Sequence, residues 1–279
     1  MVGKIIKQIS NDYTVKLEDR VLVCKARGKF RKLGLSPLVG DNVEVDLDNN
    51  YILDILKRKN ELERPRISNI DQAVIVTSVK IPDFSSNLLD KLLDIIEFNN
   101  IKPIICFTKL DLLNEEELNK IREIQKYYRS IGYDVYDNTD ANLKTIFKDK
   151  ITVFAGQSGA GKSSLLNRLD SNLNLLIGDV SIALGRGKHT TRHTELIEVL
   201  GGLIADTPGF SSLDFNGMTK MDIRDNFIEF NKYRELCEYK DCMHTKESIC
   251  GIKSNVENKN ILLSRYENYL KFIGGKSWK

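Results

Sequence analysis

The chain has 279 residues, of which 41% are hydrophobic and 29% are charged, a balance that predicts two or three folded domains and excludes a disordered protein. Its net charge of +3 is too small to indicate a polyanionic partner by itself. No long apolar run or leader-like N-terminus is present in the sequence, so we expect a cytoplasmic protein that does not contact a membrane.

Residues 1–65 contain five short segments of β-like alternation, separated by turn residues. They read "GKIIKQI", "YTVKLE", "RVLVCKA", "DNVEVDL" and "NYILDILK". Five such strands predict a small β-barrel of the OB type. Between the third and fourth lies the basic stretch "CKARGKFRKLG", which is either a solvated loop or a surface that binds RNA phosphates with one aromatic side chain for stacking. Its candidate RNA-binding residues are Lys25, Arg27, Lys29, Phe30, Arg31 and Lys32.

Residues 66–212 alternate longer strands and helices, which predicts an α/β domain with a mostly parallel sheet. The expected strands are "DQAVIVTSV", "KPIICFTK", "YDVYDN", "ITVFAG", "TELIEVL" and "LIADTPG". One helix is expected in "SSNLLDKLLDIIEFNN", starting at Ser85 or Ser86. A second should follow Asn114 as its cap, with Glu117 completing a capping box.

The segment "VFAGQSGAGKSSLLNRL" matches the phosphate-binding loop Gly-x4-Gly-Lys-Ser between a strand and a helix. In this pattern, glycines let backbone N–H groups turn toward phosphate oxygens, Lys162 binds the β- and γ-phosphates, and the Ser163 hydroxyl ligates Mg²⁺. The predicted nucleotide-binding residues are Gly156, Gln157, Ser158, Gly159, Ala160, Gly161, Lys162, Ser163 and Ser164.

Two later segments fit the switches of a nucleotide hydrolase. "IADTPGF" places Asp206 at a strand end, where it would join the Mg²⁺ shell directly or through water, and Gly209 where its N–H would sense the γ-phosphate. "GRGKHTTRHTEL" offers Thr190 or Thr191 to complete the Mg²⁺ coordination. The sequence does not decide between the two threonines, although Thr191 is slightly favoured.

The tetrapeptide "TKLD" indicates guanine as the base, but it precedes the phosphate loop. Asp111 offers two carboxylate oxygens to the N1–H and N2–H₂ donors of guanine, a donor pair that adenine lacks on that edge. Lys109 can lay its stem along the base or the loop, and Thr108 stands where asparagine is usual. This order is the GTPase motif series in circular permutation.

Residues 213–279 are expected to form helices on both sides of a Cys/His-rich knot. The helical segments are "MTKMDIRDNFIEFNKYRELC" and "NVENKNILLSRYENYLKFIGG". The knot, "CEYKDCMHTKESIC", offers three sulfurs and one imidazole, a set that suits tetrahedral Zn²⁺ and leaves no open position for catalysis. The predicted ligands of this structural zinc ion are Cys237, Cys242, His244 and Cys250.

These motifs in this order resemble the circularly permuted, small-ribosomal-subunit-dependent GTPases of bacteria, the RsgA (YjeQ) family, over essentially the whole chain. The resemblance implies three domains: an OB-fold at 1–65, a permuted GTPase domain at 66–212 and a helical zinc domain at 213–279. It further implies binding of GTP and GDP, docking on the small subunit and its rRNA late in maturation, and GTP hydrolysis stimulated by that subunit. The expected base-contacting loop after "TKLD" departs from the family pattern, because only "DNTDAN" is found, in which Asn138 and Thr139 are the candidates.

Many small GTPases carry a glutamine after Asp-x-x-Gly to orient the attacking water, but this chain has Phe210 there. His189 is the candidate catalytic residue, because a neutral imidazole can hold water and because the resemblance points to it. An RNA-binding protein that uses GTP only as a non-hydrolysed latch is the alternative. A kinase or ATPase would not explain "TKLD" or "DTPGF". Nothing resembling a coiled-coil seam demands a dimer, so we expect a monomer.

Overall fold

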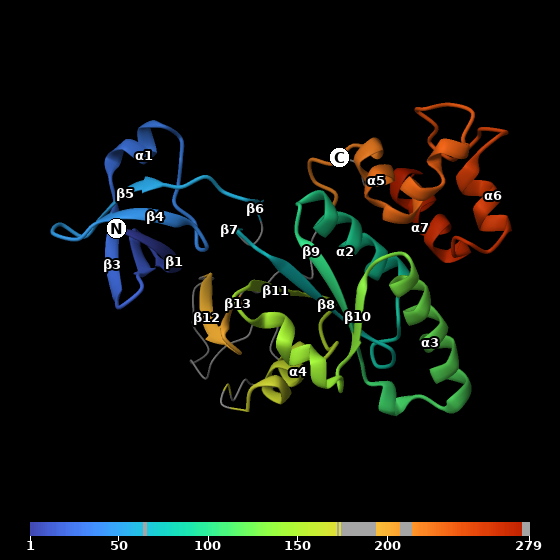
Figure 1. The fold of residues 1–279 in the computed structure, drawn as a ribbon, viewed down its shortest axis with the longest axis horizontal. Coiled ribbons are helices and arrows are strands. Elements are labelled where there is room, and N and C mark those ends of the chain that lie inside the picture. Colours follow the sequence, from blue (N-terminus) through green and yellow to red (C-terminus); the bar gives the residue numbers. More distant parts are fainter. Residues whose placement is uncertain (64–65, 172, 174–193, 207–213, 275–279) are drawn as a thin grey trace. The chain divides into compact units, whose positions relative to one another are not determined.

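A computed structural model describes residues 1–63, 66–171, 173, 194–206 and 214–274 (Figure 1). The chain forms two compact units, each built from two separate stretches. The first unit comprises residues 1–74 and 139–212, and the second comprises residues 75–138 and 213–279. Among the described residues, no helix has the length and apolar character needed to cross a membrane.

The first unit begins with a closed five-stranded barrel. Its strands are β1 (Val2–Ile9), β2 (Asp12–Lys16), β3 (Val21–Ala26), β4 (Asn42–Asp46) and β5 (Tyr51–Ile55). They pair in the order β1-β2-β3-β5-β4, and β1 also pairs with β4, which closes the barrel. Side chains alternate between the interior and the surface, as Tyr13 and Val15 on β2 illustrate. All five predicted strands and the barrel are confirmed.

The remaining elements of the first unit carry the predicted phosphate loop. They are β6 (Glu61–Glu63), β7 (Arg66–Ser68), the 3-10 helix η2 (Ala141–Phe147), β11 (Ile151–Ala155), α4 (Lys162–Leu169), β12 (Glu195–Val199) and β13 (Gly202–Asp206). Strands β11 and β13 are parallel, whereas β12 and β13 form an antiparallel hairpin. Strand β12 also pairs with β1, so the barrel and this sheet share a hydrogen-bonded edge.

The second unit contains a sheet with helices. Its strands, in the order β10-β9-β8, are β8 (Gln72–Ser78, which starts in the first unit), β9 (Lys102–Thr108) and β10 (Asp134–Asp137), and β9 is parallel to β10. Helix α2 (Ser86–Phe98) is capped by the Ser85 side chain. Helix α3 (Glu115–Ser130) has the predicted capping box of Asn114 and Glu117.

The C-terminal helices are more broken than predicted. The first segment forms α5 (Lys220–Asn226) and two 3-10 helices, η4 (Ile228–Lys232) and η5 (Arg234–Leu236), instead of one helix. The break follows from Phe227, whose ψ of 86° is not helical and whose side chain is buried. The second segment forms α6 (Gly251–Glu257) and α7 (Leu263–Gly274), separated at Lys259, which has a φ of 61°. Burial of apolar side chains therefore overrides helix propensity here.

Helix α7 packs against α2 and α5, so the C-terminal region shares a core with the strands and helices of residues 75–138 (Figure 1). Phe227 and Phe230 contact Tyr269 edge-on, with ring centroids 5.4 and 5.1 Å away. Beside them Arg265 is fully buried and bonds to Asp90 of α2 and Glu229 of η4. This arrangement joins the Cys/His-rich region to the part of the chain that carries "TKLD".

Candidate nucleotide and metal sites

The connection between β11 and α4 has the backbone of a phosphate-binding loop. Gly156, Gly159 and Gly161 have φ values of 123°, 77° and 95°, in the region that favours glycine. Gly161 precedes the first turn of α4, and no side chain caps that helix end. Its backbone N–H groups and the positive end of the helix dipole suit an anion.

Lys162 folds back over this loop. Its ammonium group donates to the carbonyl oxygens of Gly156 and Gln157, at 2.8 Å each, and burial lowers its pKa. Ser163 follows in the first helical turn with only 8% of its surface exposed. Gln157, Ser158, Gly159, Ala160, Gly161 and Ser164 complete the predicted loop as one continuous segment. A phosphate would replace two backbone carbonyls as the partner of the Lys162 ammonium group.

Several of the predicted switch residues lie outside the described part of the chain. They are His189, Thr190, Thr191 and Gly209. The backbone of Asp206 ends β13, as predicted from the strand-then-turn pattern, while its side chain lies outside the description. The hydroxyl and carboxylate groups expected to bind Mg²⁺ therefore remain predictions, apart from the placement of Ser163.

The "TKLD" residues follow β9 in the second unit. Thr108 is the last residue of β9 and is buried, and its hydroxyl donates to the Thr77 carbonyl at 3.4 Å. Lys109 turns the chain with a φ of 63°, and its ammonium group donates to the Ile81 carbonyl. This turn presents Asp111, in the short helix η1 (Leu110–Leu112), with its side chain exposed. An exposed carboxylate after a rigid turn can accept hydrogen bonds from a ligand.

The "DNTDAN" segment begins beside the same strand end. The Asn138 N–H donates to the Phe107 carbonyl at 2.8 Å, which brings the residue after β10 next to the last residues of β9. Asn138 and Thr139 were the residues that the sequence suggested for the missing base-contacting loop. The bond supports this suggestion for Asn138.

The four predicted metal ligands converge in the second unit. One ligand atom from each of Cys237, Cys242, His244 and Cys250 lies within 4.8 Å of the others. His244 Nδ1 is 3.6 Å from Cys237 Sγ and 3.4 Å from Cys250 Sγ. Tetrahedral zinc with ordinary bond lengths requires sulfur–nitrogen separations of about 3.5 Å. The cluster is consistent with a zinc site.

Backbone groups and buried rings hold these ligands in place. The N–H of Gly251 donates to Cys237 Sγ at 3.3 Å, and Tyr266 OH donates to the His244 carbonyl at 2.6 Å. Burial, helped by the positive charge of Arg224, lowers the pKa of His244 to about 4, which keeps the imidazole neutral, as a metal requires. Burial raises the pKa of Cys242 to about 12, so a bound metal displaces its proton.

The basic stretch after β3 differs from its prediction in one respect. Phe30 is 2% exposed, because the short helix α1 (Gly28–Lys32) turns its aromatic ring into the protein, so the ring is not available to stack on a base. Arg27 lies 3.4 Å from Asp46, and Lys29 lies 3.7 Å from Asp54. Lys25 and Lys32 are exposed, and the side chain of Arg31 lies outside the description. The hypothesis of an exposed aromatic is therefore wrong.

Sequence reasoning missed the pairs of charged groups that lie far apart in the chain and meet in the fold. Arg265 and Asp90 are 175 residues apart, and Lys7 of the barrel pairs with Glu195 across 188 residues. An arginine inside a predicted amphipathic helix and two aspartates on the inner face of α2 were the available signals. Neither signal identifies its partner.

The loop between β11 and α4 defines a P-loop nucleotide-binding protein, here combined with a β-barrel and a Cys₃His cluster. The RsgA GTPase family matches residues 55–216, and the RsgA N-terminal domain family matches residues 2–52. The chain belongs to the RsgA family of circularly permuted GTPases.

Proteins and structures similar to this chain cover nearly all of it. The small ribosomal subunit biogenesis GTPase RsgA 2 of Oceanobacillus iheyensis is 48% identical, over 97% of this chain and 96% of that protein. The RsgA of Enterococcus faecalis is 45% identical, over 97% of this chain and 94% of that protein. The structure of YloQ, described as a circularly permuted GTPase, has a TM-score of 0.84 at 41% identity and covers 98% of this chain and 93% of its own. The structure of YjeQ from Thermotoga maritima also has a TM-score of 0.84, at 35% identity, and covers 98% of this chain and 97% of its own.

Proposed function

We propose that this chain is a GTP hydrolase that assists biogenesis of the small ribosomal subunit. Its family and the names of relatives that match it from end to end support this function. The observation that carries the chemistry is the β11–α4 loop, where three glycines of positive φ precede Lys162. Such a loop binds the phosphates of a nucleotide through its backbone N–H groups and its lysine.

GTP and GDP are the proposed nucleotides. Residues 156–164 would hold the phosphates, and Thr108, Lys109 and Asp111 would bind the guanine. Exposure of the Asp111 carboxylate after the Lys109 turn supports its role as acceptor for the guanine N1–H and N2–H₂ donors. The Gly209 N–H would sense the γ-phosphate.

Magnesium would be bound together with GTP. Ser163, in the first turn of α4, has the hydroxyl that this ion takes from a phosphate loop, and its place after Lys162 fits that role. Thr191, or Thr190 in its place, and Asp206 would be the other protein ligands, Asp206 directly or through water. The ion would supply charge neutralisation at the β- and γ-phosphates.

His189 is proposed to position the attacking water, since Phe210 cannot donate or accept a proton. A neutral imidazole can accept a hydrogen bond from the attacking water. This bond would direct a lone pair of the water oxygen toward the phosphorus. We further propose that docking on the small subunit, late in its maturation, accelerates hydrolysis. Exposed lysines of the barrel, such as Lys25 and Lys32, would contact rRNA phosphates.

The C-terminal zinc ion is proposed to be structural, one per chain. Four protein ligands leave no open coordination position for a substrate. We propose functional boundaries near residues 65 and 212, separating the OB-fold, GTPase and zinc domains. The end of the GTPase family match at residue 216 supports the second boundary, whereas the N-terminal match ends at residue 52 and the GTPase match begins at residue 55, before the first.

Steady-state GTP hydrolysis, measured with and without isolated small subunits at fixed Mg²⁺ and salt, tests the proposal. We expect a slow basal rate that rises by orders of magnitude with the subunit. An unchanged rate combined with tight GTP binding would favour the non-hydrolysed latch. ATP competing as well as GTP would contradict the role of "TKLD".

A further inference from the structure

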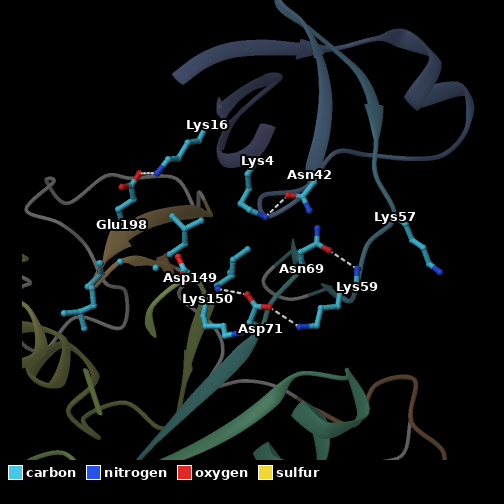
Figure 2. Close-up of a pocket in the computed structure, with 16 residues that line it drawn as sticks. Lys4, Lys16, Asn42, Lys57, Lys59, Asn69, Asp71, Asp149, Lys150 and Glu198 are labelled. Atoms are coloured by element: carbon cyan, nitrogen blue, oxygen red, sulfur yellow. Dashed lines mark hydrogen bonds and ion pairs between the residues drawn. The ribbon is translucent and has the colours of Figure 1, made fainter. Parts of the chain in front are cut away.

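A cavity of about 690 Å³ lies in the first unit, between the barrel and the β12–β13 hairpin (Figure 2). Its walls come from distant parts of the sequence, including Lys4 of β1, Lys150 before β11 and the hairpin turn at Leu200 and Gly201. Cavities of this size accommodate a ligand as large as a nucleotide.

The barrel and the hairpin are held together beside this cavity. Strand β1 pairs with β12 where Lys7 faces Glu195, and their side chains form an ion pair of 2.8 Å. Lys16 of β2 forms a second ion pair with Glu198 of β12 (Figure 2). The two walls are therefore joined by backbone and side-chain bonds.

The lining carries an excess of positive charge. Five lysines line the cavity against three acidic side chains, which leaves a surplus of two positive charges. Two of the three acids are already paired, Glu198 with Lys16 and Asp71 with Lys59, the latter at 3.0 Å. The second oxygen of Asp71 accepts the backbone N–H of Ile151 at 2.8 Å.

Three lysines thus have no carboxylate within ion-pair distance among the described residues, namely Lys4, Lys57 and Lys150. Lys57 points away from the other labelled side chains in Figure 2. Lys4 is half-buried, and its ammonium group donates to Asn42 Oδ1 at 2.8 Å. Burial lowers its pKa, and the nearby carboxylates of Asp71 and Asp41 only partly oppose this shift. A half-buried ammonium group with a neutral partner is stabilised when an anion binds beside it.

The other lining groups suit the rest of a phosphorylated ligand. Ile151, Val199 and Leu203 contribute to the walls, and Asp149 lies exposed at the edge. Aliphatic walls can contact a ribose or a base, and a carboxylate can accept a hydrogen bond from a sugar hydroxyl. A lysine binds phosphate as a point charge and needs no bidentate geometry.

We propose that this cavity is a second anion site, which binds a phosphate group of a nucleoside phosphate or of a single RNA strand, with Lys4 and Lys150 as its cationic anchors. Both sources present the same chemistry, a phosphate next to a ribose. The site is independent of the proposed GTP chemistry, because none of its lining residues belongs to the phosphate loop or to "TKLD".

The test compares Lys4→Gln/Lys150→Gln with a matched variant, Lys120→Gln/Lys126→Gln, which removes the same charge from exposed positions of α3. For the nucleotide source, labelled GDP is titrated into chains that also carry Lys162→Ala, so that the phosphate loop does not dominate the signal. If a nucleoside phosphate is the ligand, we expect about one GDP per chain to remain bound, and the Lys4/Lys150 changes to weaken this binding at least tenfold.

For the RNA source, a ten-nucleotide oligouridylate is titrated into chains with an intact phosphate loop, at several salt concentrations. The Lys4/Lys150 changes should weaken binding at least fivefold and reduce the salt slope by about 1.4, the value for two phosphate contacts on a single strand. A double change to arginine should retain binding in whichever assay responds, which separates loss of charge from loss of fold. If both assays change less than twofold relative to the matched variant, the proposal is overturned.

Discussion

Asp94 is an unusual residue on the inner face of α2. Its side chain is buried, and neither carboxylate oxygen has a hydrogen-bond partner among the described residues. Burial raises its pKa to about 9, opposed by Arg265 and reinforced by Asp90. Asp94 is therefore neutral near pH 7 in the folded chain and ionised in the unfolded chain.

This difference predicts that Asp94→Asn changes the free energy of unfolding by an amount that depends on pH. Between pH ~4 and ~9 the folded chain keeps a proton that the unfolded chain has lost, so stability falls as pH rises. The amide cannot ionise, so the variant should gain stability over the natural chain, and the gain should grow across this range. Urea unfolding at pH 5 and pH 8 measures it, with exposed Asp48→Asn as the control. Parallel pH profiles for the natural chain and the Asp94 variant would contradict the assignment.

Asp111 is the residue on which base selection is proposed to depend. Asp111→Asn should weaken GTP binding more than tenfold, because an amide opposes one of the two guanine donors. Xanthosine triphosphate has a carbonyl group at the position of that donor. Its binding affinity should therefore fall less than that of GTP. Titrations with both nucleotides provide the comparison, and equal GTP affinities would remove "TKLD" from the base site.

At the scale of elements, the buried cluster around Arg265 joins four helices, α7, η4, α2 and α3. Arg265 of α7 bonds to both oxygens of Glu229 in η4, at 2.7 and 2.6 Å, and to Asp90 in α2 at 2.8 Å. Tyr128 of α3 also donates to Asp90, at 2.6 Å. Burying these charges costs free energy, because they lose their contacts with water. Their mutual attraction and hydrogen bonds offset this cost only while all the partners are present.

Arg265→Met leaves two buried carboxylates without their cation, and should destabilise the protein by about 3–5 kcal/mol. Arg122→Met on the exposed side of α3 has the same change of side chain and should be nearly neutral. Urea unfolding of both variants gives the comparison. Similar losses in the two would mean that the cluster contributes little.

The Cys₃His cluster is the second stabilising feature of the C-terminal elements. Structural zinc in a short domain contributes on the order of 10 kcal/mol, so its loss should unfold the knot between η5 and α6. We expect about one zinc per chain in the natural protein, as is usual for a closed four-ligand site, and much less in Cys250→Ser. Metal analysis after dialysis tests this, and Cys24→Ser, in the barrel, should retain the metal. Stoichiometric zinc in the Cys250 variant would exclude Cys250 as a ligand.

At the scale of the whole molecule, the barrel is bonded to the strand that follows the predicted threonine switch. Strand β12 starts at Glu195, two residues after His193, and it pairs with β1. Contacts that move the barrel would therefore act on β12 directly. This connection gives a physical route for a partner of the barrel to change hydrolysis.

His189→Ala should lower subunit-stimulated GTP hydrolysis at least tenfold while leaving GTP affinity nearly unchanged, because the imidazole is proposed to act on water and not on the nucleotide. His193→Ala is the matched control and should retain stimulation. Single-turnover rates with and without subunits separate the two effects. Unchanged stimulated turnover in the His189 variant would remove this residue from the mechanism.

Much of the fold follows from short-range signals in the sequence. The barrel strands were predictable because residues two apart share a face, and α3 because Asn114 and Glu117 form a local capping box. The segment after Thr219 is helical as predicted, but it is divided into short helices because Phe227 leaves the helical conformation and is buried in the core. Of the two readings of the basic stretch, the one with an exposed Phe30 was wrong, because the burial of this ring depends on neighbours that the local pattern does not contain.

The sequence by itself indicated the phosphate loop, "TKLD" and the Cys/His cluster, because each depends on residues within about fifteen positions and on backbone conformations that glycine or a turn supplies. Only the tertiary structure decided which distant groups meet, as Arg265 meets Asp90, Lys7 meets Glu195, and Lys4 and Lys150 line one cavity. Burial and Coulomb interactions depend on distance in space. Separation along the chain therefore does not reveal them.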